Sequence, residues 1–141
     1  MVTFTRFRRQ GPTGTIRGEW IADARYGALP DVAQHLKRLA SAGEVLKRDP
    51  THEVLVVELQ PGAMRLLCKF FPEHTVGDRI RQRWALDRPA RMHRRLRRAA
   101  SLALPLPISL GHVSVAGVGA AWFCPLLPGK SLLHWTGENL P

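Results

Sequence analysis

The sequence has few cysteines, few acidic residues and no long apolar segment near its start. Cys68 and Cys124 are its only cysteines, and each stands in an apolar run typical of a strand. We therefore expect two buried free thiols in preference to a disulfide, and no metal site, because no paired Cys or His spacing is present. Arg6, Arg8 and Arg9 interrupt the N-terminal segment, so no signal peptide is evident.

Negative charge is scarce: 11 Asp and Glu stand against 21 Lys and Arg in 141 residues, a formal net charge of +10. A chain of this length and 45% hydrophobic content predicts one small domain with its own core. The excess positive charge favours polyanions as partners, namely nucleic acid, anionic lipid or a phosphorylated glycan.

Most of the positive charge lies in one segment, from Asp78 to Arg98. It contains two aspartates, one aromatic residue, Trp84, and nine arginines: Arg79, Arg81, Arg83, Arg88, Arg91, Arg94, Arg95, Arg97 and Arg98. Two interpretations stay open at this point, a solvated helix face and an anion-binding face. Pro89 should split the segment into two helical pieces. In the second piece, Met92, Leu96, Ala99 and Ala103 would pack on a sheet and turn the arginines outward.

Residues 99–129 contain no Asp, Glu, Lys or Arg, a length that could span a bilayer. Prolines and glycines break this stretch into pieces of strand size. Val113–Val115 and Ala120–Cys124 flank a turn at Gly117, which favours two strands over a transmembrane helix.

A strand hairpin precedes the basic segment and carries the strongest candidate for a functional side chain. Two apolar runs, from Val54 and up to Phe71, flank a turn at Pro61-Gly62. Lys69 lies in the second run, where a buried cation is costly unless an anion meets it. The alternative is that Lys69 lies on an edge strand or reaches solvent.

The N-terminal third has weaker patterns. Residues 1–28 show no clear period, and we expect an irregular arm. Residues 31–42 predict a helix, because Pro30-Asp31 suits a helix start and Val32, Leu36 and Leu39 recur at helical spacing. A strand over 44–48 should follow. The expected class is therefore α+β, with an antiparallel sheet of about five strands, a long basic helix and an extra N-terminal helix.

The order strand, strand, strand with lysine, helix, strand, strand resembles the N-terminal lobe of a protein-kinase-like fold. Several short motifs are similar to the bacterial lipopolysaccharide kinase group, the heptose and Kdo kinases and their InaA-type relatives. They are Val45-Leu46-Lys47, the basic run after Pro89, the proline-spaced Leu104–Ile108, and Pro128-Gly129-Lys130-Ser131-Leu132. The resemblance covers residues 43–135, and it implies a lobe over residues 29–141.

The resemblance implies that the lobe binds ATP. Lys69 would contact the phosphates, Leu46 and Val54 would cover the adenine, and the backbone from Cys124 to Leu126 would meet its edge. It also implies an anion-binding face formed by Arg91, Arg94, Arg95 and Arg98. An acidic membrane or an anionic glycolipid would meet that face, at the cytoplasmic side of the inner membrane.

The sequence departs from the kinase pattern in three ways. The turn Asp49–His52 replaces a glycine-rich loop, no glutamate occurs in residues 78–103 to pair with Lys69, and no catalytic base or magnesium ligand of the C-terminal lobe is present. We expect no activity from the chain alone and assign no catalytic residue. Two further classes stay open: a basic nucleic-acid-binding module, which has few aromatics for stacking, and a non-catalytic pseudokinase-like interaction domain.

Overall fold

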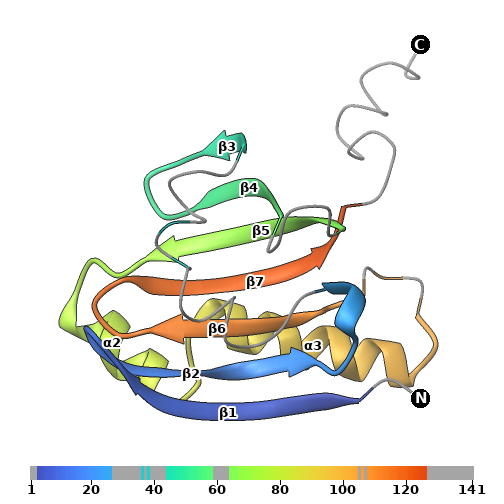
Figure 1. Cartoon of the computed structure of the whole chain (residues 1–141), viewed down its shortest axis with the longest axis horizontal. Coiled ribbons are helices and arrows are strands. Elements are labelled where there is room, and N and C mark those ends of the chain that lie inside the picture. The colour runs from blue at the N-terminus through green and yellow to red at the C-terminus, as the bar shows by residue number, and fades with distance from the viewer. Residues whose placement is uncertain are drawn as a thin grey trace.

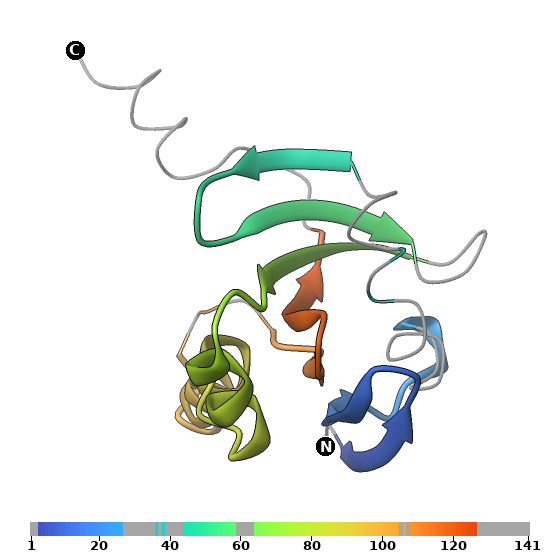
Figure 2. The ribbon, with the colours of Figure 1, turned by 90° about the vertical axis from the view of Figure 1, so that its left-hand side faces the viewer.

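The computed structural model describes residues 3–26, 36, 38, 44–58, 64–104, 106 and 108–126. These residues form one antiparallel sheet of seven strands, and the two helices over residues 76–83 and 88–101 pack on one of its faces (Figure 1, Figure 2), which confirms the α+β class. The elements are β1 Phe4–Gly11, β2 Gly14–Ile21, the 3-10 helix η1 Ala24–Tyr26, β3 Glu44–Arg48, β4 Glu53–Glu58, β5 Arg65–Pro72, α2 Val76–Arg83, α3 Arg88–Ser101, β6 Gly111–Val115 and β7 Gly119–Pro125. Their order across the sheet is β1-β2-β6-β7-β5-β4-β3.

The expectation of an irregular N-terminal arm is wrong. β1 and β2 form a continuous hairpin from the pair Phe4–Ile21 to the pair Gly11–Gly14, and β2 also pairs with β6. This hairpin raises the strand count from about five to seven. The sequence hides it because Gly18 interrupts the apolar alternation of β2. A Cβ at Gly18 would lie 2.2 Å from the carbonyl oxygen of His112, so the close pairing of β2 with β6 requires glycine there.

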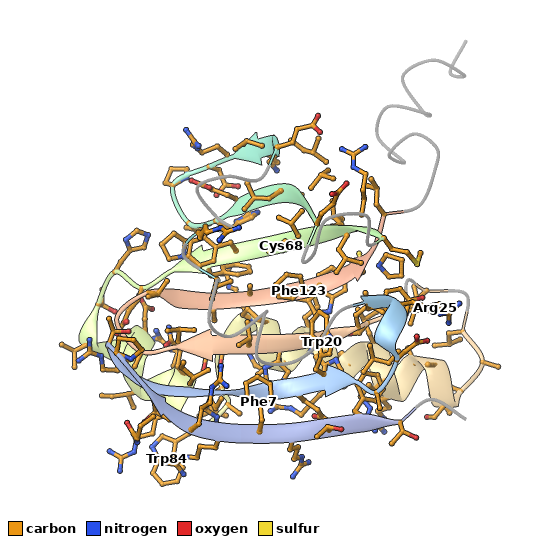
Figure 3. All side chains as sticks on the ribbon, in the orientation of Figure 1. Phe7, Trp20, Arg25, Cys68, Trp84 and Phe123 are labelled. Carbon is orange, nitrogen blue, oxygen red and sulfur yellow. The ribbon has the colours of Figure 1, made fainter. Side chains whose placement is uncertain are left out.

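The hydrophobic core lies on the sheet face opposite the two helices. In β5, Leu66, Cys68 and Phe70 point into this core, since alternate residues of a strand face opposite sides. Trp20 of β2 and Phe123 of β7 meet edge to face, with ring centres 5.1 Å apart (Figure 3). Cys68 and Cys124 are both buried and free, as expected.

The predicted helix over residues 31–42 lies outside the described residues apart from two positions. Leu36 and Arg38 are helical, and Leu36 is buried in the core. The predicted Pro128–Leu132 signature also lies outside the described part of the chain.

The basic segment forms two helices, as Pro89 predicts. Thr75 and Asp78 form a capping box at the start of α2. Asp87 caps α3 by accepting a hydrogen bond from the backbone N–H of Ala90, and Pro89 occupies the first turn, where no N–H is needed.

The face of α3 that packs on the sheet differs from the predicted stripe. Pro89, Ala90, His93 and Ala99 are its buried residues, whereas Met92 and Leu96 are half-buried and Ala103 is exposed. The buried face of the helix differs from the predicted stripe because it includes His93. The apolar pattern left this residue out, but its ring is hydrogen-bonded to Ser109.

β6 and β7 form the predicted hairpin, with a turn over residues 116–118 in which Gly117 has a φ of 83°. Among the helices of the described residues, none is long and apolar enough to cross a membrane.

Candidate functional site

Lys69 lies on an interior strand of the sheet. β5 pairs with β4 on one side and β7 on the other, so that Lys69 stands between Val54 and Trp122. The edge-strand alternative is therefore wrong. Lys69 is half-buried on the helix side of the sheet, and its Nζ lies 5.9 Å from the ring centre of Phe71.

A cavity of about 380 Å³ opens between this part of β5 and α3. We call it the lysine pocket; it is lined by Lys69, Phe71, Arg88, Arg91, Met92, Arg95 and Leu96. Every polar side chain among the described residues of this lining is a cation. Within the described part of the chain, none of these four cations forms an ion pair with a carboxylate. The pocket thus gathers positive charge without a protein counter-ion.

The turn Asp49–His52 lies beside this region, because its His52 ring contacts Phe71. Asp49 orders it, because its Oδ1 accepts hydrogen bonds from the backbone N–H groups of Thr51 and His52. The His52 ring stacks on Phe71 with centres 5.2 Å apart. Burial lowers the pKa of His52, and the charge of Lys69 pushes that pKa in the same direction.

A second cavity, of about 400 Å³, continues from the lysine pocket. It shares Phe71, Arg88 and Arg91 with the lysine pocket and adds Thr51 from the turn, and the carboxylates of Asp78 and Asp87 also line it. Together the two cavities form a groove along one flank of α3.

The predicted nucleotide-contacting residues lie at different distances from this groove. Val54 is directly opposite Lys69 on β4, and Cys124 lies on the same sheet face, on β7. Burial raises the pKa of the Cys124 thiol to about 11, so it stays neutral. Leu46 is exposed on the outer strand β3, and the backbone N–H of Leu126 already donates to the carbonyl oxygen of Arg65 at 3.3 Å.

The four predicted anion-binding arginines do not form one face. Arg91 and Arg95 line the lysine pocket, whereas Arg94 and Arg98 line a cavity on the opposite flank of α3. The reason is helical spacing, because residues four apart stack on the same side of a helix. This larger cavity, the hairpin pocket, measures about 760 Å³ and is lined by Arg6, Phe7, Arg8, Arg17, Gly18, Glu19, Ala85, Arg94, Arg97, Arg98 and His112.

A buried polar cluster beneath α3 escaped the sequence analysis. Ser109 Oγ lies 2.5 Å from His93 Nδ1 and accepts a hydrogen bond from Trp122 Nε1 at 2.8 Å. The tautomer of the His93 ring decides which of the two atoms donates in the contact between Ser109 and His93. Glu19 stands 3.7 Å from His93 Nε2 and is bound by Arg97 at 2.5 Å.

These residue types match a serine, histidine and glutamate nucleophilic triad. Ser109 is 4% exposed and bonded to a buried tryptophan, so no substrate carbonyl can reach it. The cluster therefore has a structural role, which is to fix α3 on the sheet. No local sequence signal marks it, because Ser109 and His93 meet only through the packing of α3.

No protein-family model, curated protein or solved structure matches this chain. Within the part of the chain that the structure describes, no three His, Cys, Asp or Glu side chains gather as metal ligands. The lysine pocket and the hairpin pocket, which are lined mainly by cations, are therefore the features that point to a function.

Proposed function

We propose that this chain is a nucleotide-binding lobe of the lipopolysaccharide-kinase type, in which Lys69 binds the phosphates of ATP. The observation that carries the proposal is the lysine pocket, where Lys69 and three arginines meet without a carboxylate. Cations held close together repel one another. An anionic ligand with several phosphate oxygens would reduce this repulsion.

The order of the elements supports the proposal. β3, β4, β5 with Lys69, the two helices, β6 and β7 follow one another in the order that the resemblance implies. Val54 lies beside Lys69 on the face that carries the groove, where it would support an adenine ring. Leu46 and the backbone at Cys124 would complete that contact, whereas the backbone N–H of Leu126 is already bonded to Arg65.

The proposal also explains the missing helix glutamate. In kinases a glutamate of this helix pairs with the lysine. Here Arg91 and Arg95 line the same pocket, so the ligand's phosphates would act as the counter-ion of Lys69. Arginine suits this role because its planar fork donates two parallel hydrogen bonds to a phosphate. Among the described residues that line the lysine pocket, none is a carboxylate that could bind magnesium, and Asp78 and Asp87 of the adjoining cavity act as helix caps. The proposal therefore concerns binding and not phosphoryl transfer.

Calorimetric titration of ATP into the wild type and Lys69→Met tests this function. We expect Lys69→Met to weaken binding by about 1.5–3 kcal/mol, the usual value of a hydrogen bond to a charged group. Arg25→Met is the matched control, because it removes the same charge from an exposed position outside all three cavities. Equal affinities of Lys69→Met and Arg25→Met, with the fold intact by circular dichroism, would contradict the proposed role of Lys69.

A basic nucleic-acid-binding module is the second candidate, favoured by Trp84. This ring is 67% exposed at the end of α2, beside arginines, and points away from the body of the protein (Figure 3). Exposed aromatic rings stack on unpaired bases. Binding of single-stranded DNA that falls steeply with salt and weakens in Trp84→Ala would support it. Absence of both ATP and DNA binding would leave the non-catalytic interaction domain.

The partners beyond the nucleotide belong to the same proposal. An anionic glycolipid or membrane surface would meet the arginines, and the protein would act in the cytoplasm at the inner membrane.

A further inference from the structure

We propose that the hairpin pocket is a second and separate anion site, which binds a ligand carrying at least two phosphate groups. This inference does not depend on ATP binding at Lys69. It depends on the N-terminal hairpin, because arginines of β1 and β2 line the same cavity as Arg94, Arg97 and Arg98 of α3.

Three arginines of the hairpin pocket are held in place by the protein. Arg94 donates to the carbonyl oxygen of Ala85 at 2.8 Å, and Arg17 donates to the carbonyl oxygen of Arg83. Arg97 binds Glu19 at 2.5 Å. These contacts use part of each guanidinium and fix its orientation, which lowers the entropy lost on binding a ligand.

Three more arginines of the pocket have no such partner. Within the described part of the chain, the guanidinium groups of Arg6, Arg8 and Arg98 form no hydrogen bond or ion pair. Arg6 and Arg8 come from β1, and Arg98 comes from the last turn of α3. An anion between them would therefore be contacted from two sides.

The negative charges near the pocket do not neutralise it. Among the described residues of the lining, Glu19 is the one carboxylate against six arginines, and it is already paired with Arg97. The charge of Asp87 attracts Arg17 and Arg94, but the Asp87 side chain is buried as the cap of α3. The pocket keeps a positive excess that favours a multiply charged anion.

His112 supplies an independent indication of a ligand. It lines the pocket at 8% exposure, and its Nδ1 has no hydrogen-bond partner among the described residues. Burial lowers its pKa, and the charges of Arg17, Arg94 and Arg6 act in the same direction, so the ring is neutral and close to these arginines. A buried polar atom without a partner is uncommon, and a phosphate that bonds it directly or through water would satisfy it.

The size and chemistry of the pocket define the ligand class. A cavity of about 760 Å³ lies in the range of small-molecule sites. Guanidinium groups recognise phosphate oxygens in pairs, and arginines on two sides suit two phosphates. A soluble bisphosphate and a doubly phosphorylated lipid headgroup share this chemistry.

Titration with inorganic pyrophosphate tests the site. The variant Arg8→Gln/Arg98→Gln removes two unpaired arginines, and the matched variant Arg91→Gln/Arg95→Gln removes the same charge from the other flank of α3. The shift of the His112 ring resonances during the titration reports the association constant of this site. We expect that constant to be at least about tenfold lower in the first variant than in the wild type. The matched variant should leave that constant within about twofold.

Two results would overturn the proposal. The first is an equal loss of pyrophosphate affinity in both variants, which would indicate diffuse electrostatic attraction. The second is that pyrophosphate does not shift the His112 resonances of the wild type. A loss of ATP binding in Lys69→Met with pyrophosphate still shifting His112 separates the two sites. Vesicles of phosphatidylcholine with phosphatidic acid identify the source of the ligand. Competition between vesicles and pyrophosphate supports a lipid headgroup, and its absence supports a soluble bisphosphate at the same site.

Discussion

Nδ1 of His93 lies 2.5 Å from Oγ of Ser109, and this contact joins α3 to the segment before β6. The same oxygen accepts the indole N–H of Trp122 from β7. One buried hydroxyl thus connects the helix that carries the arginines to two parts of the sheet. The cationic cavities on both flanks of α3 depend on this placement of the helix.

Replacement of this hydroxyl should be costly. Ser109→Ala leaves the N–H of Trp122 and Nδ1 of His93 without partners in a buried site, and we expect it to lower the free energy of unfolding by about 2–3 kcal/mol. Ser101→Ala is the control, because its exposed hydroxyl bonds to the carbonyl oxygen of Arg98, and it should change stability by less than about 0.5 kcal/mol. Urea denaturation measures both; equal effects would rule out a special role for Ser109.

The buried histidines should make stability depend on pH. Burial lowers the pKa of His93 to about 4 and that of His112 to about 3, from 6.5 in the unfolded chain. The unfolded state therefore binds protons first, so their contribution is complete above about pH 6.5 and is lost as pH falls towards 4. At about pH 5 we expect a loss of about 1–2 kcal/mol per histidine, measured by thermal or urea denaturation.

A variant separates these histidines from other groups. His112→Asn cannot gain the proton, so its stability should fall less steeply between pH 6.5 and 4 than that of the wild type. An unchanged slope would show that carboxylates, and not His112, govern the acid side of the curve.

Lys69→Met should not destabilise the fold. The polar lining of the lysine pocket is wholly cationic, so the substitution removes repulsion and leaves no carboxylate unpaired. We expect the free energy of unfolding to stay constant or rise by about 0.5 kcal/mol. A drop of more than about 1 kcal/mol in urea denaturation would mean that Lys69 has a structural partner.

The N-terminal hairpin should depend on Gly18. In Gly18→Ala the new Cβ would meet the backbone of His112 at 2.2 Å, so we expect a loss of about 2–3 kcal/mol and weaker pyrophosphate binding in the hairpin pocket. Gly77→Ala is the opposite case, because the atom nearest to the new Cβ is Oγ1 of Thr75, at an ordinary 3.4 Å. Alanine favours a helix there, so stability should rise by about 0.5–1 kcal/mol. A stable Gly18→Ala protein would contradict the close pairing of β2 with β6.

The strands that follow from local pattern were predicted correctly. β4, β5, β6 and β7 alternate or run apolar between turn residues, and Pro89 marked the break between α2 and α3. β1 and β2 were missed because their helix-facing side is basic and their core-facing side contains Gly18. The burial of such residues depends on neighbours that lie far away in the sequence.

The sequence by itself determined the charge excess, the class of the fold and the presence of Lys69 in a strand, since composition and period are local properties. The tertiary structure alone decided that the arginines divide between two cavities, that β1 and β2 supply half of the hairpin pocket's arginines, and that His93 is buried. These outcomes depend on the rotation of α3 about its axis. That rotation is fixed by a hydrogen bond between residues 93 and 109, a long-range contact that no local pattern encodes.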